Sequence, residues 1–399
     1  MLKYLTILIS ISIAYLDYLA YNRIVKDGVP VLARRLFASF AIVANLLPVI
    51  SPLFMYVFMN DENEGIMMKI SMTMFTIFIT LLLSRMVFYL FWFTISRKWG
   101  IYTGITFSSI IFSLLLYSAI SIRTDYRVRQ VEIEFKNLPL SFDGYRIVFI
   151  SDIHIGSMFN SQDEIKKIAD MVESIDADVV MFGGDLINLS YRELSPEILE
   201  QLSRFNKKEN VISVLGNHDT GIYIKDSINT PRTFNISKLD KAVSSIGWRL
   251  LRDSTLYLYK GCDSIAVTGI DYTDKLLGYK HSFRHPDDYC PDPLYTDVDS
   301  DIFNITLSHL PQLWRKIYDG RYSDLTLSGH VHAFQFKLIL FGIELSPAKA
   351  MYSEWSGLYG DDKGKLYVTD GTGTVGFFAR LGAYPEITVI ELKKEYSLK

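Results

Sequence analysis

The first third of the chain is far more apolar than the rest, and this asymmetry constrains the fold more than any other feature. Hydrophobic residues make up 49% of the 399 residues, but up to about residue 122 they form long, nearly uninterrupted stretches. Four such stretches run near residues 4–20, 36–59, 70–95 and 103–122. A helix needs about 20 residues to cross the hydrocarbon core of a bilayer. The pattern therefore predicts an N-terminal α-helical transmembrane bundle of four spans, whose partner is the lipid bilayer.

Two other interpretations of the apolar region fit the sequence less well. A cleaved signal peptide would explain the first stretch alone, and that stretch has a thin positive region at Lys3 and no small-residue cleavage site after it. A soluble helical bundle would need polar faces, which these segments lack. Asp17 and Arg85 are charged residues inside the stretches. Because an unpaired charge in lipid is costly, we expect these two to pair between packed helices, unless Asp17 lies in the headgroup zone.

Basic residues between the spans predict the orientation in the membrane. The loops after the first and third spans contain Arg23, Lys26, Arg34, Arg35, Arg97 and Lys98, whereas the second loop is acidic. Basic loops tend to stay in the cytoplasm, so an even number of spans leaves both termini outside. Three arginines after the last span, at positions 123, 127 and 129, favour the opposite orientation. We predict a multi-pass integral membrane protein with an extracytoplasmic C-terminal domain.

Beyond residue 122 the chain has the pattern of a soluble domain in which short β-rich runs alternate with helical patterns. The predicted strands are residues 145–150, 178–182, 211–215, 265–270, 303–308 and 324–328. Helical patterns include 162–174 and 196–205. This alternation predicts a layered α/β domain with loops gathered at the strand ends. We predict a transmembrane region at 1–122, a connector at 123–143 and the α/β domain at 144–399.

Charge and cysteine content narrow the function little. The net charge of -3 and the lack of a basic stripe predict no nucleic-acid partner, and no protein partner can be inferred. Cys262 and Cys290 could form one disulfide in an oxidising compartment, but we favour free thiols.

Short blocks rich in aspartate and histidine follow the predicted strands. They are residues 151–154, 183–185, 216–219 and 329–332, with His309 alone between the last two. Five of the seven histidines fall at these positions, and we expect the other two, His281 and His285, to lie in a polar loop without a chemical role. The carboxyl ends of strands are where open α/β sheets place their functional sites.

The residue types in these blocks suit two divalent cations. Asp152 and His154 alternate on what we expect to be an extended segment, so both could face one ion. Asp185 follows two glycines, and its two carboxylate oxygens could bridge two ions. The remaining donors are amide and imidazole groups at Asn217, His309, His330 and His332. Two ions roughly 3.5–4 Å apart could hold a phosphate and activate a water molecule.

The blocks resemble those of the calcineurin-like metallophosphoesterases, whose pattern is D-x-H, G-D, G-N-H-[DE], a lone His and G-H-x-H. The resemblance covers roughly residues 144–392 and implies an α/β metallophosphoesterase domain, a layered β-sandwich flanked by helices. It implies a first metal site formed by Asp152, His154, Asp185 and His332, and a second formed by Asp185, Asn217, His309 and His330. It also implies that His218 contacts the phosphate and protonates the leaving group, with Asp219 orienting His218.

Finer features resemble the membrane-associated branch of predicted phosphohydrolases related to YkuE and YaeI. Residues 138–147 and 367–373 match that branch, as does Arg380. The branch usually has two glycines after G-H-x-H, where this chain has Ala333 and Phe334, a bulkier pair that we expect to narrow the rim of the pocket. Arg380 could either form a structural salt bridge or face a substrate phosphate.

Together these features predict a membrane-anchored, two-metal-dependent phosphoesterase acting on phosphodiester or pyrophosphate bonds of a lipid or lipid-linked substrate. One alternative is a membrane-tethered phosphatase for soluble or cell-wall phosphate esters. Others are a catalytically inactive metal-binding scaffold and a transporter gated by the domain. Manganese is the expected metal, although iron or zinc would suit the same mixed ligands.

Overall fold

The computed structural model describes residues 2–60, 63–224, 232–272, 276, 286 and 288–396. His281 and His285 lie outside the described residues. The chain forms two compact units. The first comprises Met1–Ser121 and Gly376–Ala379, and the second comprises Ile122–Val375 and Arg380–Lys399.

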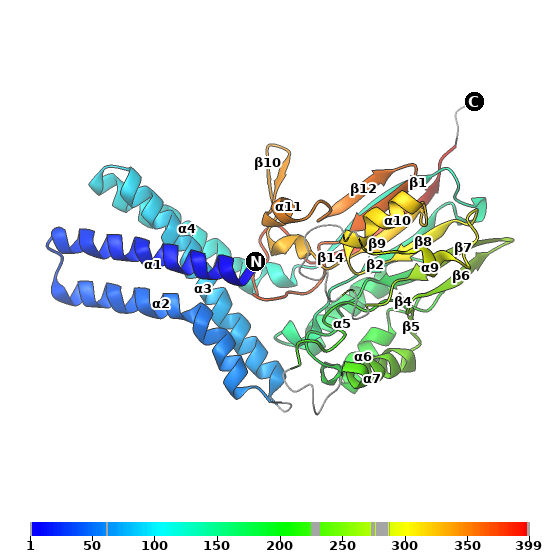
Figure 1. The fold of residues 1–399 in the computed structure, drawn as a ribbon, viewed down its shortest axis with the longest axis horizontal. Coiled ribbons are helices and arrows are strands. Elements are labelled where there is room, and N and C mark those ends of the chain that lie inside the picture. Colours follow the sequence, from blue (N-terminus) through cyan, green and yellow to red (C-terminus); the bar gives the residue numbers. More distant parts are fainter. Residues whose placement is uncertain are drawn as a thin grey trace. The chain divides into compact units, whose positions relative to one another are not determined.

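The first unit is helical. Its helices are α1 (Leu2–Lys26), α2 (Val31–Phe58), α3 (Glu64–Thr94) and α4 (Arg97–Ile120) (Figure 1). Over the described residues, three helical segments are long and apolar enough to cross a membrane: Val31–Met55, Glu64–Thr94 and Lys98–Thr124. Helix α1 is not among them, so the structure supports three of the four predicted spans, and the first span stays a prediction.

The predicted pair of charges inside the helical unit is confirmed. Arg85 Nη1 on α3 donates to Asp17 Oδ2 on α1 at 2.9 Å. Asn45 on α2 donates to the same carboxylate at 2.7 Å, and the Tyr89 hydroxyl donates to its other oxygen at 2.6 Å. Both charged side chains are buried. The carboxylate is therefore neutralised and fully hydrogen-bonded between packed helices, which is the arrangement that an apolar surrounding requires.

The second unit contains two six-stranded mixed sheets and one separate hairpin (Figure 1). The first sheet has the order β1 (Arg127–Phe135), β14 (Glu386–Lys394), β2 (Tyr145–Ile150), β3 (Val179–Phe182), β4 (Ile212–Ser213) and β5 (Arg249–Leu250). The second has the order β12 (Gly357–Asp361), β13 (Gly364–Val368), β9 (Leu325–Ser328), β8 (Asn304–Leu307), β7 (Asp263–Gly269) and β6 (Ser254–Lys260). The hairpin pairs β10 (Leu338–Leu340) with β11 (Ile343–Leu345).

Apolar residues from both sheets form one core, so the sheets pack face to face. This core includes Phe149 of β2 and Met181 of β3 from one sheet, and Ile305 of β8 from the other. The described helices of this unit are α5 (Ser161–Ser174), α6 (Pro196–Ser203), α7 (Arg232–Ser245), α9 (Asp292–Tyr295), α10 (Trp314–Gly320) and α11 (Pro347–Met351). Helices α5, α6 and α7 cover the outer face of the first sheet in a second apolar core. The predicted α/β domain is thus confirmed as two mixed sheets with flanking helices.

The six predicted strands coincide with β2, β3, β4, β7, β8 and β9, and their ends differ from the observed ones by at most two residues. Strand β2 has the predicted bounds, whereas the strand predicted at 211–215 is reduced to Ile212–Ser213 because its last residues already turn into a loop. Strand β1 lies inside the segment predicted as a connector and pairs in parallel with β14. Ser195 caps α6, since its side chain accepts a hydrogen bond from the amide of Ile198.

The two cysteines are free and exposed, as favoured from the sequence.

Candidate metal centre

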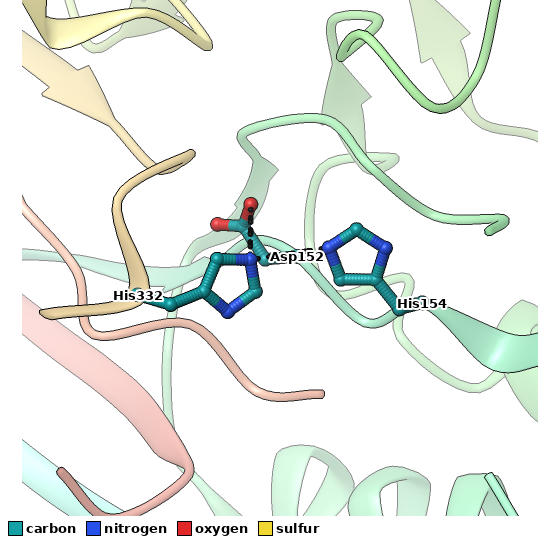
Figure 2. Close-up of side chains that lie close together, drawn as sticks. All are labelled: Asp152, His154 and His332. Carbon is teal, nitrogen blue, oxygen red and sulfur yellow. Dashed lines mark hydrogen bonds and ion pairs between the residues drawn. The ribbon is translucent and has the colours of Figure 1, made fainter. Parts of the chain in front are cut away.

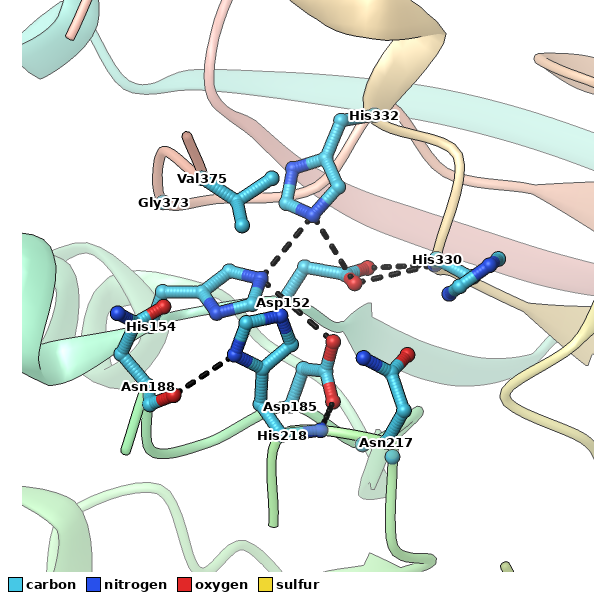
Figure 3. Close-up of polar contacts among 12 residues, drawn as sticks. Asp152, His154, Asp185, Asn188, Asn217, His218, His330, His332, Gly373 and Val375 are labelled. Carbon is cyan, nitrogen blue, oxygen red and sulfur yellow. Dashed lines mark hydrogen bonds and ion pairs between the residues drawn. The ribbon is translucent and has the colours of Figure 1, made fainter. Parts of the chain in front are cut away.

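The predicted ligands lie together at the carboxyl ends of strands from both sheets (Figure 3). Asp152, Asp185 and Asn217 follow β2, β3 and β4 of the first sheet. His309 follows β8, and both His330 and His332 follow β9 of the second sheet. Since the two sheets pack face to face, the loops at these ends converge on one place. The structure brings all the predicted ligands and His218 into one cluster, and the roles assigned to them stay proposals.

Asp152, His154 and His332 form the first group of donors (Figure 2). His332 Nε2 lies 3.2 Å from Asp152 Oδ1 and 3.1 Å from His154 Nε2. All three side chains are buried. Two imidazole nitrogens at this distance repel each other unless a proton or a cation lies between them. The donor set therefore fits a divalent metal ion.

Asp185, His309 and His330 form the second group, in which the donor atoms lie within 4.8 Å of one another. Asp185 Oδ2 is 3.2 Å from His309 Nε2 and also 3.6 Å from His154 Nε2 of the first group. Asn217 Oδ1 lies 3.2 Å from the same nitrogen of His309. One carboxylate oxygen of Asp185 thus faces both groups of donors.

Several of these residues have an unusual backbone conformation. The φ angles are positive at Asp152 (58°), His154 (48°), Asp185 (56°), His330 (72°) and His332 (51°). Non-glycine residues rarely adopt this left-handed region, and such strain gathers at functional sites. The prediction that Asp152 and His154 lie on an extended segment is therefore wrong. Instead the chain turns sharply after β2, and amides of both residues donate to the loop after β3, at the carbonyls of Gly184 and Asp185.

Glycines allow the loops to approach the carboxylates closely. A Cβ atom on Gly216 would lie 2.1 Å from Asp185 Oδ1, and one on Gly329 would lie 2.2 Å from Asp152 Oδ2. No side chain fits at these distances. Gly216 therefore lets its loop approach Asp185 closely, and Gly329 does the same at Asp152.

The charges in the cluster favour a cation. Burial alone would raise the pKa of Asp152 and of Asp185, but His332 and His309 respectively more than offset it and hold both pKa values below their ordinary range. Burial would lower the pKa of His309, yet Asp185 raises it to about 9. Two buried carboxylates thus create a negative potential at His309 Nε2. A position that stabilises a proton in this way also attracts a metal ion.

His218 lies at the edge of the cluster and is only half-buried. Its Nδ1 donates to the backbone carbonyl of Asn188 at 2.7 Å, which fixes the ring (Figure 3). The hydrogen bonds of Asp219 differ from the orienting contact with His218 that the family resemblance implied. Its buried carboxylate instead accepts backbone amides of Asp185 and Gly216, at 2.7 and 2.9 Å, together with two further amides. Asp219 therefore holds the Asp185 loop, while Asn188 orients His218.

No sequence signal indicates that Asn188 contacts His218. Its contact uses a backbone carbonyl, which every residue type possesses, so no side-chain signal marks the position. The contact depends entirely on where the loop after β3 places that carbonyl.

Arg380 contacts His332, one of the predicted ligands, on the side of the ring that carries Nδ1. It is fully buried and donates to the carbonyl oxygens of Gly373, Asp370 and Ala383 at 2.8, 3.0 and 2.9 Å. Its Nη2 also lies 3.2 Å from His332 Nδ1. Burial lowers the pKa of Arg380 to about 10, so the guanidinium stays charged at neutral pH. The buried guanidinium of Arg380 is therefore bonded to backbone carbonyls and to His332, one of the predicted ligands.

Ala333 and Phe334 both adopt the left-handed conformation, with φ of 48° and 49°. Ala333 is fully buried, and the Phe334 ring packs 5.9 Å from the ring of Tyr352. This backbone explains why glycines suit the two positions, since glycine adopts such angles without strain. The expected narrowing of the pocket rim by this pair stays a prediction.

Comparison with known proteins agrees with this geometry. Residues 145–342 match the model of the family described as calcineurin-like phosphoesterase. The chain is 29% identical over 261 residues to the metallophosphoesterase YkuE of Bacillus subtilis, covering 64% of this chain and 82% of that one. It is 27% identical over 294 residues to a transmembrane protein with metallophosphoesterase domain of Danio rerio, covering 70% of this chain and 60% of that one. It is also 25% identical over 240 residues to the UDP-2,3-diacylglucosamine pyrophosphatase LpxG of Chlamydia trachomatis, covering 51% of this chain and 68% of that one.

The chain therefore contains a calcineurin-like metallophosphoesterase domain. Its relatives include YkuE and transmembrane metallophosphoesterases, which is the branch that the sequence features indicated. The family supports a metal-dependent phosphoester hydrolase, and the apolar helices together with the relatives named as transmembrane proteins indicate a membrane protein.

Proposed function

We propose that this protein is a membrane-anchored, dinuclear metallophosphoesterase that hydrolyses phosphodiester or pyrophosphate bonds of a lipid or lipid-linked substrate. The observation that carries the proposal is the position of Asp185 Oδ2, which faces the first donor group at His154 and the second at His309. A carboxylate in this position allows one phosphate to be held between two cations.

Each residue of the centre has a proposed role. Asp152, His154 and His332 would hold one ion with Asp185, and Asn217, His309 and His330 would hold the other with the same carboxylate. Bound divalent ions, manganese by preference, would polarise the phosphoryl oxygens and acidify a water molecule.

Substrate would approach from the side of His218 and His330, because these are the half-buried members of the cluster. The hydrogen bond from His218 Nδ1 to Asn188 leaves Nε2 free to face the phosphate. A phosphate anion beside that nitrogen favours the protonated imidazole, which can donate its proton to the leaving oxygen.

Two facts favour a lipidic substrate. The chain carries helices apolar enough to cross a membrane, which keeps the domain near lipid. One relative is named as a pyrophosphatase for a diacylated nucleotide sugar, a substrate that joins acyl chains to a pyrophosphate. A domain outside the cytoplasm, as the basic loops predict, would act on lipids of the outer leaflet.

The test is hydrolysis by the full-length protein in mixed micelles with Mn²⁺. A lipid phosphodiester and a lipid pyrophosphate would be compared with short-chain, water-soluble analogues that carry the same headgroups. We expect faster hydrolysis of the lipid forms, and no hydrolysis by Asp185→Asn. Equal or faster hydrolysis of the soluble analogues would favour a tethered phosphatase for soluble or cell-wall esters instead. No hydrolysis of any substrate by the wild type would favour a metal-binding scaffold.

A further inference from the structure

The hairpin of β10 and β11, residues 338–345, exposes an unusual concentration of apolar side chains. Six large hydrophobic residues are exposed within these eight positions: Leu338, Ile339, Leu340, Phe341, Ile343 and Leu345. The other exposed large hydrophobic residues described in the second unit are scattered along the chain. Single exposed apolar residues are normal, but a contiguous patch on a soluble surface marks an interaction site.

The pairing of the two strands places most of these side chains on one face. Leu338 pairs with Leu345, and Leu340 pairs with Ile343, and side chains of directly opposed residues point to the same face of a sheet. These four aliphatic residues therefore form one continuous apolar face. The opposite face carries Ile339 beside Glu344, the one charged residue of the hairpin.

The turn presents an aromatic ring at the tip of the hairpin. Phe341 and Gly342 both have positive φ, 52° and 78°, which is the geometry of a two-residue turn between twisted strands. A phenylalanine in this conformation is strained, and Phe341 is fully exposed, with a relative accessibility of 103%. Figure 1 shows the hairpin standing away from the two sheets of its unit. A fully exposed aromatic ring at a protruding tip adds no buried apolar area to the domain, and its backbone strain lowers the stability. Contact with a partner would bury the ring.

The base of the hairpin is fixed to the metal centre. His332 lies six residues before Leu338, and Lys337 at the base is buried, with Nζ 2.8 Å from Ser356 Oγ and 3.4 Å from Asp370 Oδ2. The Lys337 amide also donates to the carbonyl of Leu381, next to Arg380. The base of the hairpin is therefore bonded to Ser356, Asp370 and Leu381 through Lys337.

The partner that fits this surface is the bilayer itself. The covalent connection between α4 and β1 is the short segment 121–126. Six residues span at most roughly 21 Å, so the domain cannot move far from the membrane that its own helices enter. The face formed by Leu338, Leu340, Ile343 and Leu345 carries no charge, and apolar and aromatic side chains of this kind enter the boundary between headgroups and acyl chains.

We propose that the hairpin of residues 338–345 inserts its apolar face and Phe341 into the membrane surface, and so sets the metal centre at the level of the lipid headgroups. The inference builds on the proposed function, because it explains how a lipid phosphate reaches His218 and His330 without leaving the bilayer.

The test is the depth of a probe at the tip in the full-length protein. Cys262 and Cys290 are replaced by serine, Phe341→Cys is labelled with an NBD fluorophore, and the protein is placed in vesicles of phosphatidylcholine and phosphatidylglycerol. The matched control is Tyr259→Cys, since Tyr259 is an exposed aromatic residue outside the hairpin, on β6. We expect doxyl-labelled lipids to quench the probe at position 341 and not the probe at 259. Quenching of the probe at position 341 that is no greater than quenching at position 259 would overturn the proposal. This holds whether the probe at 341 then lies in water or against protein.

Hydrolysis separates this inference from the proposed function. Phe341→Asp should lower hydrolysis of a lipid phosphodiester in the vesicles several-fold relative to Tyr259→Asp, and leave hydrolysis of soluble bis(p-nitrophenyl) phosphate unchanged. Equal loss on both substrates would contradict a role at the membrane. If the wild type hydrolyses neither substrate, the proposed function fails, while the quenching result still decides whether the hairpin enters lipid.

Discussion

Replacing Arg380 by methionine should destabilise the second unit by about 3–5 kcal/mol, the cost of removing one partner from a buried charged network. Methionine fills a similar volume but donates no hydrogen bonds. The carbonyls of Asp370, Gly373 and Ala383 would then be buried without the donor that they have in the structure. Each unsatisfied buried group costs about 1–3 kcal/mol, and entry of water would recover part of that sum. His332 would also lose the group that faces its Nδ1.

The assay is thermal unfolding of the full-length protein in detergent, followed by tryptophan fluorescence. The expected decrease in the free energy of unfolding corresponds to a decrease of roughly 6–20 °C in the unfolding midpoint for a domain of this size. The control is Arg315→Met, because Arg315 is exposed and forms an ion pair with Asp319 four residues later on α10. Exposed pairs of this kind contribute about 0.5 kcal/mol or less. A midpoint for Arg380→Met equal to that of Arg315→Met would refute the positioning role, as would unchanged Mn²⁺ affinity, which we expect to fall about 10–100-fold.

Three further predictions follow from the geometry of the centre. His218→Gln should lower kcat for phosphodiester hydrolysis about 10²–10⁴-fold, because His218 is proposed to donate a proton to the leaving group. The amount of bound Mn²⁺, measured by mass spectrometry, should stay unchanged, since His218 is not proposed to hold an ion. A matching loss of Mn²⁺ would contradict that role. Ala333→Gly should leave the unfolding midpoint near that of the wild type. Ala333→Val should lower the midpoint by several degrees, since a β-branched residue is strongly strained at a φ of 48°. Equal midpoints for the two variants would show that the backbone at residue 333 relaxes. Mn²⁺ affinity measured by calorimetry should rise with pH up to about 9. The reason is that Asp185 raises the pKa of His309 to about 9, and a bound ion must displace the proton on His309. An Mn²⁺ affinity that is independent of pH between 6 and 9 would argue against His309 as a ligand.

The strands that lead into the centre were predictable because each ends in a recognisable block. Apolar β-rich runs before Asp152 and Asp185 mark β2 and β3, and the polar residues after them have no use inside a core. The same logic placed His309 after β8 and His330 after β9. Ligand chemistry therefore indicated both the site residues and the ends of the strands on which they lie.

The local geometry of the site could not be predicted in the same way. Left-handed backbone at Asp152 and His154 costs free energy that only the surrounding hydrogen bonds offset, and those bonds come from the distant loop at Gly184. Asp219 was expected to orient His218, but a fully buried carboxylate needs several donors, and the amides of its own neighbourhood supply them. Short edge elements such as β5 and the hairpin of residues 338–345 depend on pairing that is visible only in three dimensions.

The proposed metal centre is tested most directly by the rate of bis(p-nitrophenyl) phosphate hydrolysis by the full-length protein after chelation and stepwise return of Mn²⁺, with Asp185→Asn measured beside it. We expect no hydrolysis after chelation, recovery that requires two ions per chain, and no recovery in the variant. Hydrolysis that survives chelation, or that Asp185→Asn retains at the wild-type rate, would contradict the proposal that this carboxylate holds two ions around a phosphate.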